Sequence, residues 1–553
     1  MVALERDARR AAVNAIAITA IAMGLSACAK SAPPPPPVAT PAPPPPAAPP
    51  VAVEPPPLEP LPDVFESPSY IVRTVKPGDT AASLAERYLG GAGRAWMIEE
   101  YAGRQAIQPD TEVVIPKRDW NPPGVYPSGY QLVPVLVYHN IAPQRKGRLT
   151  IGAATFEEQI RYLKAEGFYS IGLDEFVDFL QQRRQLPKKS VLLTFDDGHK
   201  GFLQYAYPVI KAAGFRVVLF IQTDQISSRP NANSLSWPEL QELAKEGVVV
   251  QAHTKTHGDL RKKAGESPDA YARRMQAELG APLDLLRKNL PRPAGAPETV
   301  AYPFGEADDE VVRYVKQYGY VAGFTVQRRS NPAFVPLALI GRSQVYSDWS
   351  AEDFKKNLNL FRAETPLPVA GDGPGDGPPA TATAQPTPRG RAASRYVERA
   401  AQLERAGDLR AALDECGVAL TIDPTNAAAQ AQQRRLDARI ESGVATRMKE
   451  GQRLARTSPD DAARQFTAVL ALDPLNQAAF QALRDAPRAG RFLTHTVRGR
   501  ETAESLADLY YGDRSRADLI EQVNGIEPGA ALVPGRALKI PEIPGVPFLR
   551  PDR

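Results

Sequence analysis

Cysteine is scarce and charge is nearly balanced in this sequence of 553 residues. Its only two cysteines, Cys28 and Cys416, exclude a disulfide framework and a zinc site built from four thiolates. The 67 Lys and Arg residues barely outnumber the 63 Asp and Glu residues, so we expect no nucleic-acid partner. The 55 prolines cluster without a glycine period, which excludes collagen. At about 100–200 residues per domain, the length predicts several domains.

The first 28 residues have the pattern of an export signal. A mildly basic start precedes an apolar run at 11–27 that is marginal in length for a membrane-spanning helix. The run ends in Leu-Ser-Ala-Cys, which resembles the bacterial lipobox and implies lipidation of Cys28 and a membrane anchor. Because Ala29 follows the cysteine, the resemblance implies the outer membrane of a Gram-negative bacterium, facing the periplasm. An ordinary signal peptide with an incidental cysteine is the alternative.

Two low-complexity segments are predicted to be linkers. Residues 29–68 form a Pro-rich linker, and 17 of the 30 residues at 33–62 are proline. Such a segment favours polyproline II, which rises about 3.1 Å per residue and would hold the following domains away from a membrane. Residues 363–394 are rich in Pro, Gly, Ala and Thr and are predicted to form a second, flexible linker.

Apolar runs alternate with amphipathic segments between residues 130 and 362. Seven runs are strand candidates: Val133–Tyr138, Val191–Phe195, Val217–Ile221, Val248–Gln251, Val300–Tyr302, Val321–Val326 and Leu337–Ile340. This alternation predicts a parallel α/β barrel or a doubly wound sheet. His139, Asp196, Asp197 and His253 each come just after such a run. In α/β barrels, active sites gather at these strand ends.

The polar residues at these strand ends include the donors of a metal site. One carboxylate from Asp196-Asp197-Gly198 and the imidazoles of His253 and His257 provide three ligands and leave a position open for water. Adjacent aspartates at a strand end point in different directions, so one can bind metal while the other acts as a base. We therefore expect one divalent ion. Zinc is the first choice, although cobalt, nickel and iron suit the same donors.

The same residues carry a resemblance to a known family. Residues 194–198 (TFDDG) and 253–257 (HTKTH) match the first two motifs of the NodB-homology polysaccharide deacetylases, carbohydrate esterase family 4. Those enzymes are distorted (β/α) barrels that use a divalent metal to remove acetyl groups from N-acetylglucosamine residues. The resemblance implies Asp196 as the general base. It implies three metal ligands: Asp197, His253 and His257.

The sequence departs from the family pattern at its third and fifth motifs. Residues 301–305 (AYPFG) lack the Arg that usually orients the base, and Arg342 is the proposed substitute, with a plain surface Arg as the alternative. The third motif also implies that a backbone N–H near Phe304 binds the oxyanion. The domain has no histidine after residue 257 to serve as the fifth-motif general acid. His139 is our candidate for that role, and a purely structural histidine is the alternative.

Two further positions near the motifs are less informative. His199 directly follows the Asp-Asp-Gly turn and is expected to be peripheral. Asp348-Trp349 resembles the Asp-Trp of the family's fourth motif, whose aromatic ring forms one wall of the substrate groove, but the surrounding residues match poorly.

Two distant segments resemble each other over about 50 residues. The sequence VKPGDT at residues 75–80 recurs as VRGRET at residues 497–502, and both are followed by Ser-Leu-Ala and a tyrosine. The predicted order of strand, helix, helix and strand resembles the LysM module, which binds N-acetylglucosamine-containing glycans such as peptidoglycan and chitin.

The resemblance implies a LysM-like module 1 at 69–118 and a LysM module 2 at 492–545. It implies Asn524 and Gly525 as glycan-binding residues of module 2, where the family often carries Asn. Module 1 has Ala and Gly at the matching place, which makes glycan binding there less certain. A small βααβ spacer that binds nothing is the alternative for each.

Residues 395–486 contain two helix-hairpin segments. They end in IDPTN at 422–426 and LDPLN at 472–476, and the apolar positions before these endings match at helical spacing. The segments resemble tetratricopeptide repeats, whose usual period is about 34 residues, so we expect an extra helix within this longer period. The repeats would either dock on a protein partner or space module 2. Cys416 is expected to be a core residue here.

Together these features predict a multidomain α/β protein. With the resemblances, the expected architecture is a distorted (β/α) barrel deacetylase domain at 130–362, flanked by two small βααβ LysM modules and accompanied by an all-α helical-repeat segment. The expected function is metal-dependent removal of N-acetyl groups from N-acetylglucosamine in an envelope polysaccharide, either peptidoglycan or an exopolysaccharide. A catalytically inactive peptidoglycan-binding scaffold is the alternative, favoured by the two departures. Hydrolysis of another amide or an ester, such as an O-acetyl group, also fits the ligands.

Overall fold

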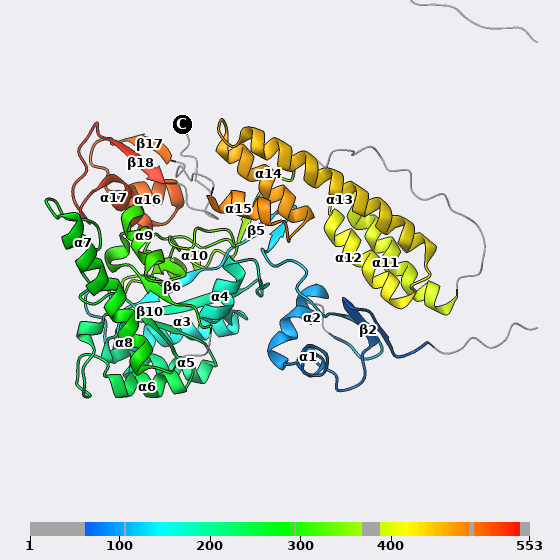
Figure 1. Cartoon of the computed structure of the whole chain (residues 1–553), viewed down its shortest axis with the longest axis horizontal. Coiled ribbons are helices and arrows are strands. Elements are labelled where there is room, and N and C mark those ends of the chain that lie inside the picture. The colour runs from blue at the N-terminus through cyan, green and yellow to red at the C-terminus, as the bar shows by residue number, and fades with distance from the viewer. Residues whose placement is uncertain (1–60, 104–106, 292–294, 368–386, 486–491, 542–553) are drawn as a thin grey trace, which may run out of the picture. The chain divides into compact units, whose positions relative to one another are not determined.

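The structure is a computed structural model that describes residues 61–103, 107–291, 295–367, 387–485 and 492–541 (Figure 1). The predicted export signal, Cys28 and nearly all of the Pro-rich linker lie outside the described residues. Within those ranges, no helix combines the length and apolar character that crossing a membrane requires.

A curled parallel sheet is the framework of the region between residues 130 and 362. Its strand order is β14-β13-β12-β11-β10-β6-β15, and every neighbouring pair on this path is parallel. The strands are β6 (Val135–Tyr138), β10 (Ser190–Asp197), β11 (Val218–Ile221), β12 (Val249–Ala252), β13 (Thr299–Ala301), β14 (Ala322–Phe324) and β15 (Ser343–Gln344). The sheet curls into a half-barrel, and an isolated bridge joins Phe324, at the end of β14, to Ile340, which lies three residues before β15.

Six of the seven predicted strands match observed strands, and the last one is displaced. Residues 337–340 contribute only the bridge at Ile340, and the strand β15 begins at Ser343. Prolines explain the difference, because Pro332 and Pro336 each open a turn closed by a backbone hydrogen bond. The second turn includes residues 337–339, so these residues do not form the strand that the apolar run predicted.

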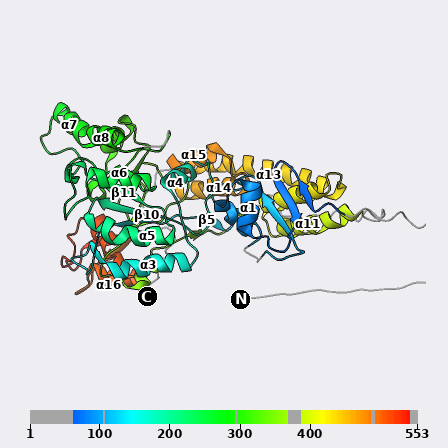
Figure 2. The same ribbon diagram turned by 90° about the horizontal axis from the view of Figure 1, so that it is seen from below.

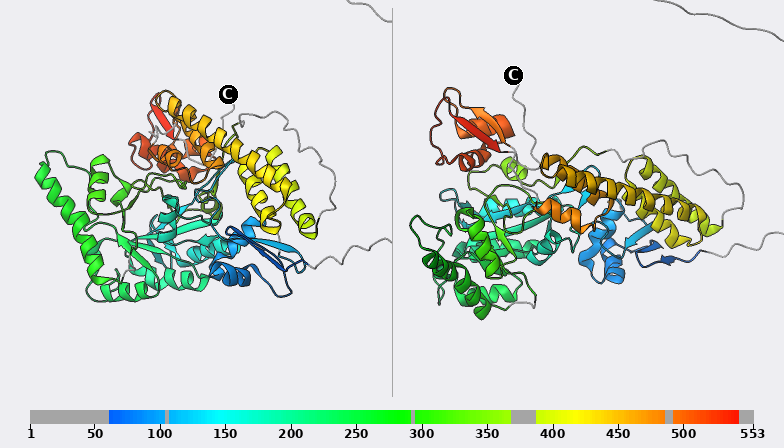
Figure 3. Two further views of the ribbon diagram at one scale, coloured as in Figure 1. Left: turned by 45° about the vertical axis from the view of Figure 1, so that its right-hand side comes forward. Right: turned by 45° about the horizontal axis from the view of Figure 1, so that its top comes forward.

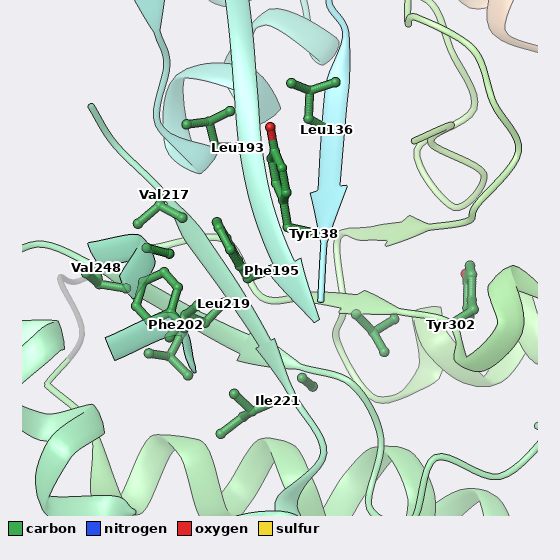
Figure 4. Packing of buried hydrophobic residues seen from close by; sticks show 14 of the residues in the cluster. Leu136, Tyr138, Leu193, Phe195, Phe202, Val217, Leu219, Ile221, Val248 and Tyr302 are labelled. Atoms are coloured by element: carbon green, nitrogen blue, oxygen red, sulfur yellow. The ribbon is translucent and has the colours of Figure 1, made fainter. Parts of the chain in front are cut away.

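Both faces of the parallel strands are apolar, as expected for a sheet covered on both sides. Leu193, Phe195 and Leu219 belong to one cluster of buried side chains (Figure 4). The same cluster contains side chains of α3 (Ala153–Ala165), α5 (Tyr207–Ala213) and α6 (Trp237–Lys245), helices that are labelled in Figure 2. Their neighbours Leu192, Val218 and Phe220 belong to a different cluster. Because side chains alternate along a strand, consecutive residues such as Leu192 and Leu193 pack in different clusters.

Shorter elements complete this region. The remaining helices are α4 (Leu173–Leu180), α7 (Pro268–Met275), α8 (Ala281–Asn289), α9 (Asp309–Gln317) and α10 (Ala351–Lys356). The remaining strands are β4 (Val125–Tyr126), β5 (Gly129–Gln131), β7 (Asn140–Ala142), β8 (Thr150–Gly152), β9 (Tyr169–Ser170) and β16 (Phe361–Ala363). Strand β9 pairs with the start of β10, and β16, β5 and β4 form an antiparallel sheet.

Five helices make up the all-α segment (Figure 3). They are α11 (Pro388–Arg405), α12 (Leu409–Ile422), α13 (Ala427–Leu454), α14 (Pro459–Leu472) and α15 (Gln477–Asp485). The expected extra helix does not occur within residues 387–485; instead α13, with 28 residues, packs against both α12 and α14 and accounts for the long period. Gly451 permits its close approach to α14, because a Cβ there would lie 2.6 Å from the Phe466 ring.

Cys416 is fully buried in α12, as the apolar stripe predicted. Burial raises the pKa of its thiol to about 12. A thiol that stays protonated at neutral pH is a poor nucleophile, so this cysteine acts as a core residue.

The two similar segments fold into units with the same order of elements. The first contains β2 (Tyr70–Thr74), α1 (Ala81–Leu89), α2 (Ala95–Tyr101) and β3 (Glu112–Pro116), preceded by β1 (Val64–Glu66). The second contains β17 (Phe492–Thr496), α16 (Ala503–Tyr511), α17 (Ala517–Asn524) and β18 (Ala537–Pro541). Thr80 and Thr502 form equivalent capping boxes at the first helix of each unit, and a left-handed glycine ends that helix in both.

The two units also share a buried polar contact around that helix. Arg73 donates to Asp79 at 2.8 Å and to the Tyr88 hydroxyl at 3.0 Å. At the matching positions of the second unit, the His495 ring lies 2.8 Å from both Glu501 and the Tyr510 hydroxyl. His495 is therefore held in the interior of its own unit by these two contacts.

Candidate active site

The register of the parallel strands brings the predicted site residues together at the carboxyl ends of β6, β10 and β12. Tyr138 pairs with Phe195, so His139 and Asp196 follow at the same level of the sheet. Ile221 of β11 pairs with both Asp197 and Ala252, which places His253 just beyond Asp197. Asp197 has a left-handed backbone, with φ 74°, and the carboxylates of Asp196 and Asp197 approach His253 Nε2 to 3.7 Å and 3.6 Å.

Asp197, His253 and His257 form a cluster with the geometry of a metal site. The Asp197 Oδ1 atom lies 3.6 Å from His253 Nε2 and 3.8 Å from His257 Nε2, and all three donor atoms lie within 4.8 Å of one another. Ligands about 2.0–2.2 Å from a tetrahedral zinc ion are roughly 3.3–3.6 Å apart, so these residues fit a divalent ion.

Hydrogen bonds orient two of these three candidate ligands, His253 and Asp197. His253 Nδ1 lies 2.8 Å from the Ala301 carbonyl oxygen, and because a carbonyl only accepts, Nδ1 carries the proton and Nε2 offers its lone pair. His199 Nε2 lies 3.2 Å from Asp197 Oδ2, which leaves Oδ1 to face the two imidazoles. His199 was expected to be peripheral; its place two residues after Asp197 was the only signal in the sequence for this contact.

Asp196 is held by a buried arginine. Arg342 has no exposed surface and donates from both terminal nitrogens to the two Asp196 oxygens, each at 2.7 Å. A third hydrogen bond joins its Nε to the Thr325 carbonyl oxygen at 2.9 Å. The surface alternative for Arg342 is therefore excluded, and its guanidinium holds the Asp196 carboxylate through both oxygens.

The Asp196 carboxyl group is ionised in this setting. Burial alone would raise its pKa, but the positive charge of Arg342 and the hydrogen bonds from its guanidinium outweigh burial. The net effect holds the pKa of Asp196 below its usual range. Burial likewise opposes ionisation of Asp197, but the hydrogen bond from His199 helps to lower the pKa of that carboxyl.

His139 lies beside these carboxylates and is half-buried. Its Nδ1 atom is shielded from solvent and has no hydrogen-bond partner among the described residues. Burial lowers the pKa of this imidazole, and the charges of Asp196 and Asp197 oppose that effect. A buried ring nitrogen without a protein partner is available to a ligand in the site.

Phe304 is presented at the surface by a strained turn. Its backbone is left-handed, with φ 60°, and its side chain is 60% exposed. Gly305 follows with φ 77°, and a Cβ there would lie 2.4 Å from Val326, so only glycine fits. The Phe304 ring meets the His257 ring edge-on at 4.8 Å between centroids, which places this turn directly beside the candidate metal ligands.

The Asp348-Trp349 pair does not line an exposed wall. Trp349 is buried and packs against Tyr346 and the Arg328 guanidinium, whereas Asp348 is exposed and lies 3.3 Å from Arg148. Burial of the indole removes it from contact with a substrate, so the resemblance to the fourth motif does not supply a groove wall here.

Asn524 is occupied by hydrogen bonds within its own unit. Its amide nitrogen donates to the carbonyl oxygens of Ile520 and Lys539, and its amide oxygen accepts from the Lys539 N–H at 2.8 Å. Gly525 is the left-handed cap of α17. The polar atoms of Asn524 thus join α17 to β18, and the contact of Asn524 and Gly525 with glycan stays a prediction.

Asn524→Ala is expected to lower the free energy of unfolding of the second βααβ unit by about 1–3 kcal/mol, because it removes three hydrogen bonds. Amide hydrogen exchange at Lys539 should become faster, while exchange in β10 stays unchanged. Unchanged exchange at Lys539 together with lost glycan binding would instead favour the contact with glycan.

Comparison with known proteins finds two families along the chain. The family model described as Polysaccharide deacetylase matches residues 183–323, and the LysM domain model matches residues 495–541. The second match covers the second βααβ unit, and the assignment of the first unit to the LysM family stays a prediction.

Individual relatives agree with the first of these families. YxkH of Bacillus subtilis (strain 168), which its name places among the polysaccharide deacetylases, is 26% identical over 195 residues, 35% of this chain and 64% of that protein. The chain thus spans slightly less than two thirds of this relative. The poly-beta-1,6-N-acetyl-D-glucosamine N-deacetylase of Staphylococcus aureus (strain MSSA476) is 27% identical over 199 residues, 34% of this chain and 68% of that protein.

A solved structure of the Streptococcus pyogenes deacetylase PplD, in complex with acetate, is 24% identical and covers 42% of this chain and 99% of that one, with a TM-score of 0.36. The curled parallel sheet, the motifs at its strand ends and the two family matches lead to one conclusion. The chain contains a polysaccharide deacetylase domain and a LysM domain.

Proposed function

We propose that this protein is a metal-dependent hydrolase that removes N-acetyl groups from N-acetylglucosamine residues of an envelope polysaccharide. One observation carries the proposal: the three-ligand cluster of Asp197, His253 and His257 lies next to an ionised, arginine-bound Asp196. When bound by that cluster, a divalent ion supplies Lewis acidity that activates water and polarises a carbonyl oxygen.

Asp196 is the proposed general base. It is ionised because Arg342 binds both of its oxygens, so it can accept a proton from the attacking water. Arg342 also fixes the carboxylate in one orientation through its additional bond to Thr325. A base held in this way needs no reorganisation before it takes the proton.

The remaining steps are assigned to Phe304 and His139. The backbone N–H of Phe304 is proposed to bind the oxyanion, and one such donor is typically worth about 10²–10³ in rate. His139 is proposed to give a proton to the departing amine. The water oxygen joins the acetyl carbon, the carbon–nitrogen bond breaks, and acetate and a glucosamine unit are released.

The proposed substrate is a polymer rather than a free sugar. The LysM family binds N-acetylglucosamine-containing glycans, and a LysM domain tethered in the same chain would raise the substrate concentration near the active site. The name of the Staphylococcus aureus relative makes poly-β-1,6-N-acetylglucosamine the first polymer to test, and peptidoglycan the second. The export signal and Cys28 support a lipid-anchored protein in the cell envelope, proposed to face the periplasm from the outer membrane.

The inactive-scaffold alternative has lost one of its two arguments. It was favoured by the missing Arg of the third motif, but Arg342 binds Asp196 with both terminal nitrogens. The all-α segment is proposed as the part of the chain on which a protein partner docks.

Acetate release by the full chain tests the proposal. The substrates are β-1,6-linked N-acetylglucosamine oligomers, peptidoglycan glycan strands and an O-acetylated sugar ester, each with and without added zinc. We expect zinc-dependent acetate release from at least one N-acetylated polymer. Release from the ester alone would identify an esterase, and release from none of the substrates would support the scaffold.

A further inference from the structure

A buried carboxylate, from a helical turn about 20 residues further along the chain, binds the loop that carries His253 and His257. Glu278 is only 7% exposed. Its Oε2 atom accepts hydrogen bonds from the backbone N–H groups of Lys255 and Thr256, each at 3.0 Å, and its Oε1 atom accepts from the Thr256 hydroxyl at 2.7 Å. One carboxylate therefore binds two of the three residues that separate His253 from His257.

Glu278 is presented by an irregular turn of helix. It lies in the π-helical turn η4 (Gln276–Gly280), between α7 and α8, where Glu278, Leu279 and Gly280 are all buried. A π-turn adds one residue to the regular helical repeat and occurs frequently at functional sites. From this turn Glu278 contacts the loop, while the next residue, Leu279, packs in the apolar core.

The loop itself is strained. Thr254 and His257 both have left-handed backbones, with φ values of 65° and 61°. Such conformations are costly for residues other than glycine and persist where surrounding contacts impose them. Inside the loop, the Thr254 hydroxyl accepts from the His257 N–H at 3.1 Å, and Glu278 provides contacts from outside.

A simple ion pair does not explain the position of Glu278. The Lys255 ammonium group bonds to Asp224 at 2.6 Å, and Glu278 instead uses its oxygens on backbone and hydroxyl donors. The three hydrogen bonds that Glu278 accepts hold the conformation of one short segment. They do not pair Glu278 with the charged end of Lys255.

We propose that Glu278 is a positioning residue that sets the separation of the His253 and His257 Nε2 atoms, and with it the affinity of the cluster for a divalent ion. The proposal rests on the metal site of the proposed function. Groups that hold metal ligands in place commonly contribute 10-fold to 100-fold to metal affinity.

The test measures zinc binding by the full chain in competition with a chromophoric chelator. Glu278→Gln keeps the size of the side chain but points an amide N–H₂ at hydrogen-bond donors, so the zinc dissociation constant should rise by about 10-fold to 100-fold. The visible spectrum of the cobalt-loaded protein should change as well, because the ligands move. Asp284→Asn is the matched control, since Asp284 lies on α8 with its side chain 76% exposed, and should leave both readings unchanged.

Thr256→Val provides a second variant that removes one of the three hydrogen bonds and should raise the dissociation constant by about twofold to tenfold. A folded Glu278→Gln protein with the parent's zinc affinity and cobalt spectrum would overturn the proposal. If that variant fails to fold, an unchanged zinc affinity in Thr256→Val overturns it. Failure of the parent protein to bind zinc would contradict the proposed function instead.

Discussion

An Asp196→Asn variant is expected to release acetate about 10²–10⁴-fold more slowly than the parent while binding zinc equally tightly. The loss follows because an amide cannot take the proton that the ionised carboxylate accepts. Zinc binding should persist, since the cluster of Asp197, His253 and His257 keeps all three donor atoms. Initial rates of acetate release and a zinc titration on the same sample provide the two readings.

Two control variants separate loss of the base from loss of the metal. Asp197→Asn should lose both zinc affinity and acetate release, because it changes a ligand. Asp348→Asn should change neither, because Asp348 is exposed and pairs only with Arg148. An Asp196→Asn variant with the parent's activity would remove Asp196 from the role of general base.

Arg342→Met is expected to lower the free energy of unfolding of the deacetylase domain by about 3–5 kcal/mol at neutral pH. The cause is the Asp196 carboxylate, which would stay buried without the cation that binds both its oxygens. For a domain of this size, such a loss corresponds to a drop in melting temperature of roughly 6–20 °C. Differential scanning calorimetry of the full chain measures the shift.

The pH dependence of this effect has a definite sign. In the parent the pKa of Asp196 is lowered, so the stability from its ionisation is present above the usual Asp pKa and is lost as pH falls through the native value. In Arg342→Met, burial without the cation raises the pKa of Asp196, and protonation then relieves the buried charge. The difference in stability between parent and variant should therefore shrink as pH falls.

A double variant, Asp196→Asn with Arg342→Met, should recover most of the lost stability and remain inactive, because it removes both buried charges. The matched control is Arg313→Met, whose side chain is 60% exposed and 3.5 Å from Glu310. It should change stability by no more than about 0.5 kcal/mol. An Arg342→Met protein that melts with the parent would show that the ion pair contributes little.

The sequence was most informative where chemistry and periodicity coincide. The parallel strands follow apolar runs, and the motif residues follow the strands, so register alone brings Asp197 and His253 together. Arg342 could be named as a substitute, but its burial could not be predicted. The position of Arg342 depends on the turns that begin at Pro332 and Pro336, because these turns form the connection between β14 and β15.

Other features depend on tertiary contacts that leave no local pattern. The contact of His199 with Asp197 depends on a side-chain direction at a strand end, where Asp197 has φ 74°. Asn524 matched a glycan-binding position by family resemblance, yet its amide bonds to the backbone of β18. One long helix, α13, takes the place of the expected extra helix, and its close approach to α14 at Gly451 is a tertiary contact that no local pattern reveals.

The central claim is that Asp197, His253 and His257 hold the divalent ion on which hydrolysis depends. The most direct test strips the full chain with a chelator, adds zinc back in steps, and follows bound zinc and acetate release together. We predict that release is near zero without metal and rises in proportion to bound zinc until one ion is bound per chain. Acetate release that persists in metal-free protein, or zinc binding that survives replacement of Asp197 by alanine, would contradict the account.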